Sequence, residues 1–119
     1  IMRQRFRRKK MNVTQISVNE LSDLVNDGAL LIDVRDPAEH TTARVPQAVS
    51  IPLSTVPDRL SEVPTDGPVY VICAKGGRSQ MAVEFYTQQG VQAINVTGGT
   101  DAWLSAGFEH RSGPAGAER

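Results

Sequence analysis

The sequence predicts a single α/β domain, built on a central parallel sheet of about five strands with helices on both faces. Short apolar segments rich in β-branched residues alternate with helix signals, a pattern typical of parallel strands joined by helical crossovers. The chain has 119 residues, enough for one hydrophobic core but too few for a second domain. Its only cysteine is Cys73, which excludes an intramolecular disulfide and a multi-cysteine metal site, and we expect neither metal nor cofactor.

The first expected helix is marked at both ends. Ser17 and Glu20 have the spacing of a capping box, which predicts a helix that begins after Ser17 and continues through Asn26. Gly28 can then supply the left-handed residue that follows a helix end. The apolar residues 29–34 predict a buried strand directly afterwards.

A second, shorter helix is expected to follow that strand. Asp36 suits the N-cap, Pro37 the first helical position and Glu39 the third. Residues 49–51 predict another strand. Residues 54–63 predict a short helix bounded by prolines.

The second half of the chain repeats the alternation and contains the cysteine. Residues 69–72 predict a strand, Cys73 follows it directly, and a helix is expected from 78 to 90. A strand at 93–96 and a short helix at 101–106 complete the pattern. Because ligands of parallel α/β sheets bind at the carboxyl ends of strands, Cys73 lies where a functional site is expected.

The loop after this strand has the composition of an anion cradle. It joins a strand end to a helix start, so its backbone N–H groups can converge on one anionic point, and two glycines permit the tight turn. We expect Cys73 to be catalytic and the rest of the loop to bind substrate; that remainder is Ala74, Lys75, Gly76, Gly77, Arg78 and Ser79.

Lys75 and Arg78 are expected to add two positive charges beside the Cys73 sulfur. A cysteine in such a setting has a pKa below its ordinary value and is largely thiolate at neutral pH. Neither His40 nor His110 adjoins it in sequence, and the proposed nucleophile needs no histidine base. The alternative is a buried, inert thiol at a strand end, because free cysteine is among the most buried residue types. The combination of strand, cysteine, basic residue, Gly-Gly, arginine and helix start favours the functional interpretation.

Several motifs resemble those of the rhodanese (thiosulfate sulfurtransferase) family over roughly residues 14–109. The loop from Cys73 to Arg78 is similar to the six-residue active-site loop of single-domain members. Three further segments resemble family signatures: Asp33-Val-Arg-Asp-Pro-Ala-Glu39, Val45-Pro-Gln-Ala-Val-Ser-Ile-Pro-Leu53 and Gly98-Gly-Thr-Asp-Ala-Trp-Leu-Ser-Ala-Gly107. The resemblance implies a ping-pong sulfurtransferase. The Cys73 thiolate takes sulfane sulfur from thiosulfate or a persulfide donor, sulfite leaves when thiosulfate is the donor, and the Cys73 persulfide passes the sulfur to cyanide or a thiol, including that of a thioredoxin-like protein.

Two positions depart from the family pattern Gly-His-Ile-Pro-Gly-Ala. Gln47 stands in place of a glycine, so the local turn can differ, and Arg44 stands in place of the histidine, which we interpret as a packing or rim position. Asp33 and Arg35 are interpreted as structural, pairing with backbone groups and with Glu39.

Trp103 is expected in the core, with its indole N–H needing a partner.

Other functions remain as alternatives. Dual-specificity phosphatases of related fold also use Cys and Arg in an anion cradle, but with one residue more between them; here four residues separate Cys73 from Arg78, which suits a sulfur atom better than a phosphate ester. Arsenate reduction is a minor alternative. A non-catalytic binding or regulatory module is the alternative from another class, but such domains usually lose the cysteine. Mercaptopyruvate is a poorer donor candidate, because the resemblance there is to two-domain proteins whose cysteine loop, of the type Cys-Gly-Ser/Thr-Gly, is less basic than the loop of this chain.

Charge is segregated along the chain although the formal net charge is zero. Six of the 13 basic residues precede Met11, and the remaining seven stand against 13 acidic residues. We expect residues 1–11 to be a basic disordered leader or expression remnant, 12–110 the domain and 111–119 a flexible tail. No apolar run reaches the length of a bilayer span. We expect a cytoplasmic monomer with no specific nucleic-acid partner.

Overall fold

Five parallel strands form one sheet in the computed structural model, which describes residues 12–114. The sheet order is β1-β5-β4-β2-β3, so β4 is the central strand, with β2 and β5 as its neighbours. The strand bounds are Gln15–Ile16 for β1, Leu30–Asp33 for β2, Val49–Ser50 for β3, Pro68–Ile72 for β4 and Gln92–Val96 for β5. The predicted α/β class, the parallel sheet of five strands and its helical layers are confirmed.

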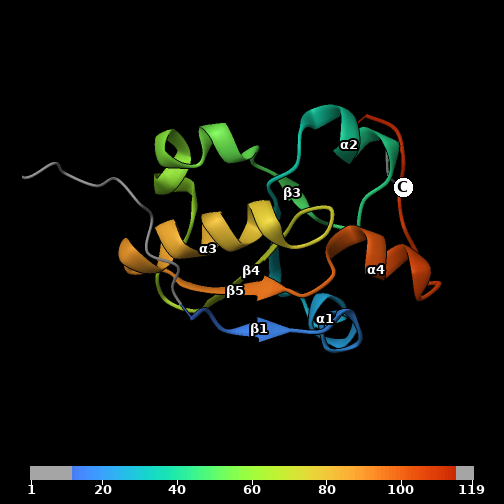
Figure 1. Ribbon diagram of the computed structural model, residues 1–119, viewed down its shortest axis with the longest axis horizontal. Helices are drawn as coiled ribbons and strands as arrows, with labels where there is room; N and C mark the ends of the chain where they lie inside the picture. The colour runs from blue at the N-terminus through green and yellow to red at the C-terminus, as the bar shows by residue number, and fades with distance from the viewer. Residues whose placement is uncertain (1–11, 115–119) are drawn as a thin grey trace, which may run out of the picture.

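Helical segments cover both faces of the sheet. Helix α3 (Gly77–Gln88) lies on one face with two 3₁₀ segments, η1 (Leu53–Thr55) and η2 (Pro57–Glu62). Helices α1 (Val18–Asn26) and α4 (Gly99–Ser105) pack on the other face. Figure 1 shows α3 above the sheet and α1 below it. Within residues 12–114 no helix is long and apolar enough to cross a membrane.

The side chains of β4 alternate between two hydrophobic cores. Val69 and Val71 pack in the core beneath α3, whereas Tyr70 and Ile72 pack against α1 and α4. All four are buried, as expected for a central strand of a parallel sheet. Because successive side chains of an extended chain point to opposite faces, Cys73 continues the series of Val69 and Val71 and belongs to the core on the α3 side.

The predicted helix signals are found at the helix starts. Ser17 and Glu20 form the capping box of α1, with the Glu20 N–H donating to Ser17 Oγ over 3.1 Å. Helix α2 (Pro37–Thr42) begins after Asp36, whose N–H donates to Glu39 Oε1 over 3.1 Å. Gly28 adopts the expected left-handed conformation after α1, with φ +90°.

Two elements differ from the sequence prediction. Strand β1 was not expected; it has only two residues and is defined by its pairing with β5, where Gln15 aligns with Asn95 and Ile16 with Val96. The expected short helix at 54–63 is instead the pair of 3₁₀ segments η1 and η2, with a non-helical backbone at Arg59 inside the second.

The segment 111–114 does not behave as the free tail that the sequence predicted. Arg111 forms an antiparallel bridge with Arg44, and the Gly113 N–H donates to the Thr41 carbonyl over 2.8 Å. The buried Arg44 guanidinium donates to the Gly113 carbonyl over 2.7 Å. These bonds attach the start of the expected tail to the end of α2. Residues 1–11 and 115–119, which complete the expected leader and tail, lie outside the described residues.

Candidate active site

The carboxyl end of β4 is the point where three connections meet. The backbone continues from Ile72 through Cys73 into the loop that starts α3. Asp33, the last residue of β2, aligns with Ile72, and β5 runs parallel to β4 on its other side. The segments that follow β2 and β5, α2 and α4, therefore flank the loop of β4, as Figure 1 shows. A side chain at the start of α2 or α4 can reach the residues around Cys73.

The Cys73 sulfur lies in a cradle of hydrogen-bond donors. The Gly76 N–H donates to Sγ over 3.1 Å, and Ser79 Oγ lies 3.3 Å from Sγ. Cys73 is 1% exposed, so its thiolate is largely removed from solvent. Burial alone would raise the pKa of this thiol, but hydrogen bonds from the Ser79 hydroxyl and from the backbone N–H groups of Ser79, Gly76 and Lys75 outweigh that effect. The net result is a pKa below the ordinary value.

The start of α4 fixes the backbone of the cysteine loop. The Thr100 N–H donates to the Cys73 carbonyl over 2.8 Å, and the Asp101 N–H donates to the Ala74 carbonyl over 3.0 Å. Gly99 permits this close approach, because a Cβ there would lie 2.5 Å from both carbonyl oxygens. Gly99 also has φ +61°, a conformation that favours glycine. With both carbonyls bonded outward, the N–H groups of the loop remain available to the sulfur.

The two cations of the loop have carboxylate partners. Arg78 makes a bidentate pair with Glu39 of α2, at 2.7 Å and 3.0 Å, and both side chains are 36% exposed. Lys75 Nζ lies 2.7 Å from Asp101 Oδ2 of α4, in a more exposed position. The pair with Arg78 lowers the pKa of Glu39 to about 2, and the pair with Asp101 raises the pKa of Lys75.

Two cavities lie near the loop, and the second of them is lined partly by loop residues. One of about 330 Å³ lies between α2 and the start of α4 and is lined by Arg35, Ala38, Glu39, Thr42, Ala43, Thr100, Asp101 and Leu104. The other, of about 260 Å³, is lined by polar residues of β1, β5 and the loop: Gln15, Lys75, Gly76, Gly77, Gln80, Asn95, Thr97 and Gly98. Cys73 itself lines neither of these two cavities.

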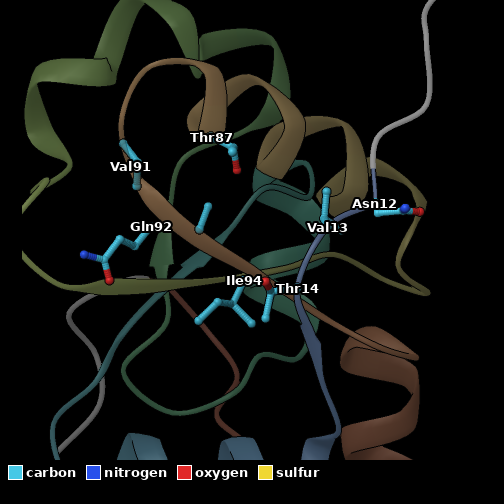
Figure 2. A pocket seen from close by; sticks show the side chains of 8 residues that line it. Asn12, Val13, Thr14, Thr87, Val91, Gln92 and Ile94 are labelled. Carbon is cyan, nitrogen blue, oxygen red and sulfur yellow. The ribbon is translucent and has the colours of Figure 1, made fainter.

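A third cavity lies away from the cysteine. It has a volume of about 350 Å³ and is situated at the start of β5, beside the chain that leads into β1. Figure 2 shows Val91 and Gln92 at one side of it and Val13 at the other. None of its lining residues is titratable at physiological pH. The cavity lies at the amino-terminal ends of the parallel strands, whereas Cys73 follows the carboxyl end of β4. We therefore assign the site to the cysteine loop.

Comparison with known proteins identifies the family. Residues 17–106 match the model of the rhodanese-like domain. The chain belongs to this family. It is 37% identical over 99 residues to a protein of Allochromatium vinosum named sulfurtransferase, a match that covers 81% of this chain and 92% of that one. It is 31% identical to the thiosulfate sulfurtransferase GlpE of Pseudomonas syringae, over 75% of this chain and 85% of the relative.

Solved structures agree with this assignment. A rhodanese-related protein from Thermoplasma volcanium superposes with a TM-score of 0.78 at 30% identity, covering 82% of this chain and 97% of that one. A protein from Staphylococcus saprophyticus superposes with a TM-score of 0.74 at 36% identity, over 82% and 99% of the two chains. The predicted family and fold are confirmed.

The two departures from the family signature have a structural explanation. Gln47 has φ +71°, the only positive value among the described non-glycine residues, so it retains the left-handed turn that a glycine would adopt without strain. Arg44 is 1% exposed and bonds the carbonyls of His40 and Gly113. It is thus a packing residue of the rhodanese-like domain, in agreement with the sequence interpretation.

Asp33 and Arg35 form a buried structural network beneath α2. Arg35 donates to both carboxylate oxygens of Asp33 and, over 2.7 Å, to the Ala43 carbonyl. His40 Nδ1 lies 3.0 Å from Asp33 Oδ2. The structural role expected for Asp33 and Arg35 is supported, but the partner expected from sequence is wrong: Glu39 pairs with Arg78.

Trp103 is 3% exposed and donates its indole N–H to the Glu109 carbonyl over 2.8 Å, as expected for a core tryptophan.

Sequence reasoning missed Glu39 and Asp101 as residues of the site. It treated Lys75 and Arg78 as charges directed at the sulfur, whereas each is held by a carboxylate from a neighbouring connection. A signal was present in the topology, because α2 follows β2 and α4 follows β5, and both strands flank β4. Acidic residues in the first turn of either helix are thereby brought to the cysteine loop.

Proposed function

We propose that this rhodanese-like domain is a sulfurtransferase in which Cys73 carries sulfane sulfur as a persulfide between a donor and an acceptor. The observation that supports it most directly is the cradle around Sγ, where the Gly76 N–H and the Ser79 hydroxyl lie within 3.3 Å of the sulfur. Such donors stabilise an anion, and the thiolate is the reactive form of cysteine.

The proposed reaction has two displacements at sulfur. In the first, the Cys73 thiolate attacks the outer sulfur of thiosulfate, the new S–S bond forms as the S–S bond of the donor breaks, and sulfite leaves with the bonding electron pair. In the second, cyanide or a thiolate attacks the outer sulfur of the Cys73 persulfide, and the Cys73 thiolate is released. No external oxidant or reductant is consumed, because each step exchanges one sulfur–sulfur bond or converts it into a bond to the acceptor.

The loop supplies the environment for both steps. We assign the backbone of Ala74, Gly76 and Gly77 to the walls of the cradle and Ser79 to the donor that stabilises the thiolate. Lys75 and Arg78 contribute positive potential at the mouth of the site, reduced by their carboxylate partners. The acceptor class is a small thiol, cyanide or the thiol of a thioredoxin-like protein. We propose a cytoplasmic location, because the mechanism depends on a cysteine that stays reduced. We propose a monomer, because the mechanism uses residues of one chain only.

The proposed function is tested by activity on two substrate classes. Wild-type protein is expected to form thiocyanate from thiosulfate and cyanide and to leave a generic aryl phosphate unhydrolysed. Cys73→Ser is expected to be inactive while retaining the thermal stability of the wild type, because a hydroxyl is almost entirely protonated at neutral pH. Phosphate release by the wild type, dependent on Cys73, would assign the cradle to phosphoryl transfer. Activity retained by Cys73→Ser would exclude the persulfide mechanism.

A further inference from the structure

We propose that Glu39 is a specificity-determining residue of this site, which selects persulfide donors of low net charge over dianionic thiosulfate. The inference rests on the proposed function and concerns the chemical class of the donor. It arises from the charges that line the cavity of about 330 Å³ between α2 and α4.

The residues that line this cavity are bonded to the cysteine loop. Thr100 and Asp101 form part of its wall, and their N–H groups bond the carbonyls of Cys73 and Ala74. Glu39 forms the opposite wall and bonds Arg78 at the far end of the same loop. Both walls of the cavity are thus hydrogen-bonded to the segment that holds the nucleophile.

The charged groups that face this cavity are mainly carboxylates. Glu39 and Asp101 line it, whereas their partners Arg78 and Lys75 do not. Arg35 also lines it, but its guanidinium is buried and donates to Asp33 and to the Ala43 carbonyl. Leu104 and Ala38 add apolar surface. The wall therefore presents the carboxylate end of each neutral pair, which disfavours a dianion relative to an uncharged or cationic group.

Glu39 also limits what Arg78 can do. The bidentate pair uses both terminal nitrogens of the guanidinium, the atoms that would otherwise bind two oxygens of an incoming anion. With a pKa of about 2, Glu39 is a carboxylate across the physiological pH range, so the pair is electrically neutral there. Thiosulfate must compete with Glu39 for Arg78, whereas a persulfide need not, since its leaving group carries no oxyanion.

The chemistry is the same for both donor classes. With a persulfide donor, the Cys73 thiolate attacks the outer sulfur, the donor's S–S bond breaks, and the donor leaves as a thiolate with the bonding electron pair. The outer sulfur keeps its proton or negative charge when it becomes the outer sulfur of the Cys73 persulfide. Atoms and electrons balance without a co-reactant, and the donors differ only in the charge brought to the cavity.

A series of donors with graded charge tests the inference. Thiosulfate carries two negative charges, methanethiosulfonate one, and cysteamine persulfide is balanced by its ammonium group. The rate constant for loading Cys73 is measured for each donor without acceptor, by alkylation and intact-mass analysis. Glu39→Gln preserves the shape of the side chain and its capacity to accept the Asp36 N–H, and the matched control is Glu62→Gln, which removes a carboxylate paired with Arg59 in η2.

Glu39→Gln is expected to raise loading by about tenfold for thiosulfate and about threefold for methanethiosulfonate at low salt, and to leave cysteamine persulfide within about twofold. The gain for thiosulfate should shrink at high salt. Glu62→Gln should change none of the three rates. Asp101→Asn, a second variant in the same cavity, should rank the three donors in the same order but change each loading rate by a smaller factor.

The outcomes separate this inference from the proposed function. Equal changes for all three donors, or no change, would show that Glu39 shapes the loop and does not select charge, while the sulfurtransferase assignment would stand. If no donor loads Cys73 in folded wild-type protein, the proposed function itself fails, and the inference fails with it.

Discussion

Gly99→Ala is expected to damage the site by forcing the start of α4 away from the cysteine loop. The added Cβ would lie 2.5 Å from the carbonyl oxygens of Cys73 and Ala74, which is too close for contact with backbone atoms. The positive φ of Gly99 costs a residue with a Cβ about 1–2 kcal/mol. Movement that relieves the clash weakens the two hydrogen bonds from Thr100 and Asp101, each worth about 0.5–1.5 kcal/mol.

These contributions predict a loss of about 2–5 kcal/mol in the free energy of unfolding, and a decrease in Tm on the order of 10–20 °C. Because a displacement of about 1 Å in a positioned nucleophile costs about 100-fold in rate, kcat/KM for sulfur transfer should fall at least that far. Thermal unfolding by circular dichroism and the thiosulfate–cyanide assay measure the two effects.

Gly107→Ala is the matched control for the backbone strain. Gly107 has φ +82°, and a Cβ there would meet no atom within 4 Å. The Gly107→Ala variant should lose about 1–2 kcal/mol in the free energy of unfolding, because alanine is strained in the left-handed conformation, and should retain full activity per folded molecule. If Gly99→Ala and Gly107→Ala show the same Tm and the same kcat/KM, the start of α4 does not position the loop, and the reasoning is refuted.

Three further perturbations follow from named contacts. Ser79→Ala removes a hydrogen bond that lowers the pKa of Cys73, so the rise of kcat/KM with pH should move to higher pH. Activity should fall about tenfold at neutral pH and be unchanged on the alkaline plateau. A pH profile that does not move would contradict the role of Ser79. Gln47→Gly should raise the free energy of unfolding by about 0.5–1 kcal/mol in denaturant titration, because glycine adopts φ +71° without strain; destabilisation would show that the Gln47 side chain matters more than its backbone. Truncation after His110 should cost about 1–3 kcal/mol, since the buried Arg44 loses the Gly113 carbonyl, whereas truncation after Pro114 should leave Tm unchanged; equal Tm values would show that segment 111–114 contributes nothing.

Local signals sufficed for most of the fold. Capping residues and prolines mark the starts of α1 and α2, and β-branched runs mark β2 and β4, because these features act over a few neighbouring residues. Strand β1 carries no such signal. Its two residues are extended because β5 lies beside them, and that partner is distant in the chain.

The candidate site was predictable where its residues are contiguous and not where tertiary contacts define it. Cys73, Gly76 and Ser79 lie between the end of β4 and the first turn of α3, so the convergence of Gly76 and Ser79 on the sulfur follows from a strand–loop–helix connection. Arg78 and Glu39 are 39 positions apart. The sequence predicted that Glu39 pairs with Arg35, which is nearer in the chain. In the structure Asp33 binds the Arg35 guanidinium. Because β2 lies next to β4 in the sheet, helix α2 brings Glu39 to Arg78 instead.

The central claim, that Cys73 carries sulfur covalently, is tested most directly by intact mass. After incubation with thiosulfate and removal of small molecules, the wild-type protein should be heavier by the mass of one sulfur atom. Cyanide or dithiothreitol should restore the original mass, and Cys73→Ser should show neither change. If folded wild-type protein with a titratable Cys73 thiol gains no sulfur from thiosulfate, mercaptopyruvate or a persulfide donor, the catalytic account is contradicted and a binding role replaces it.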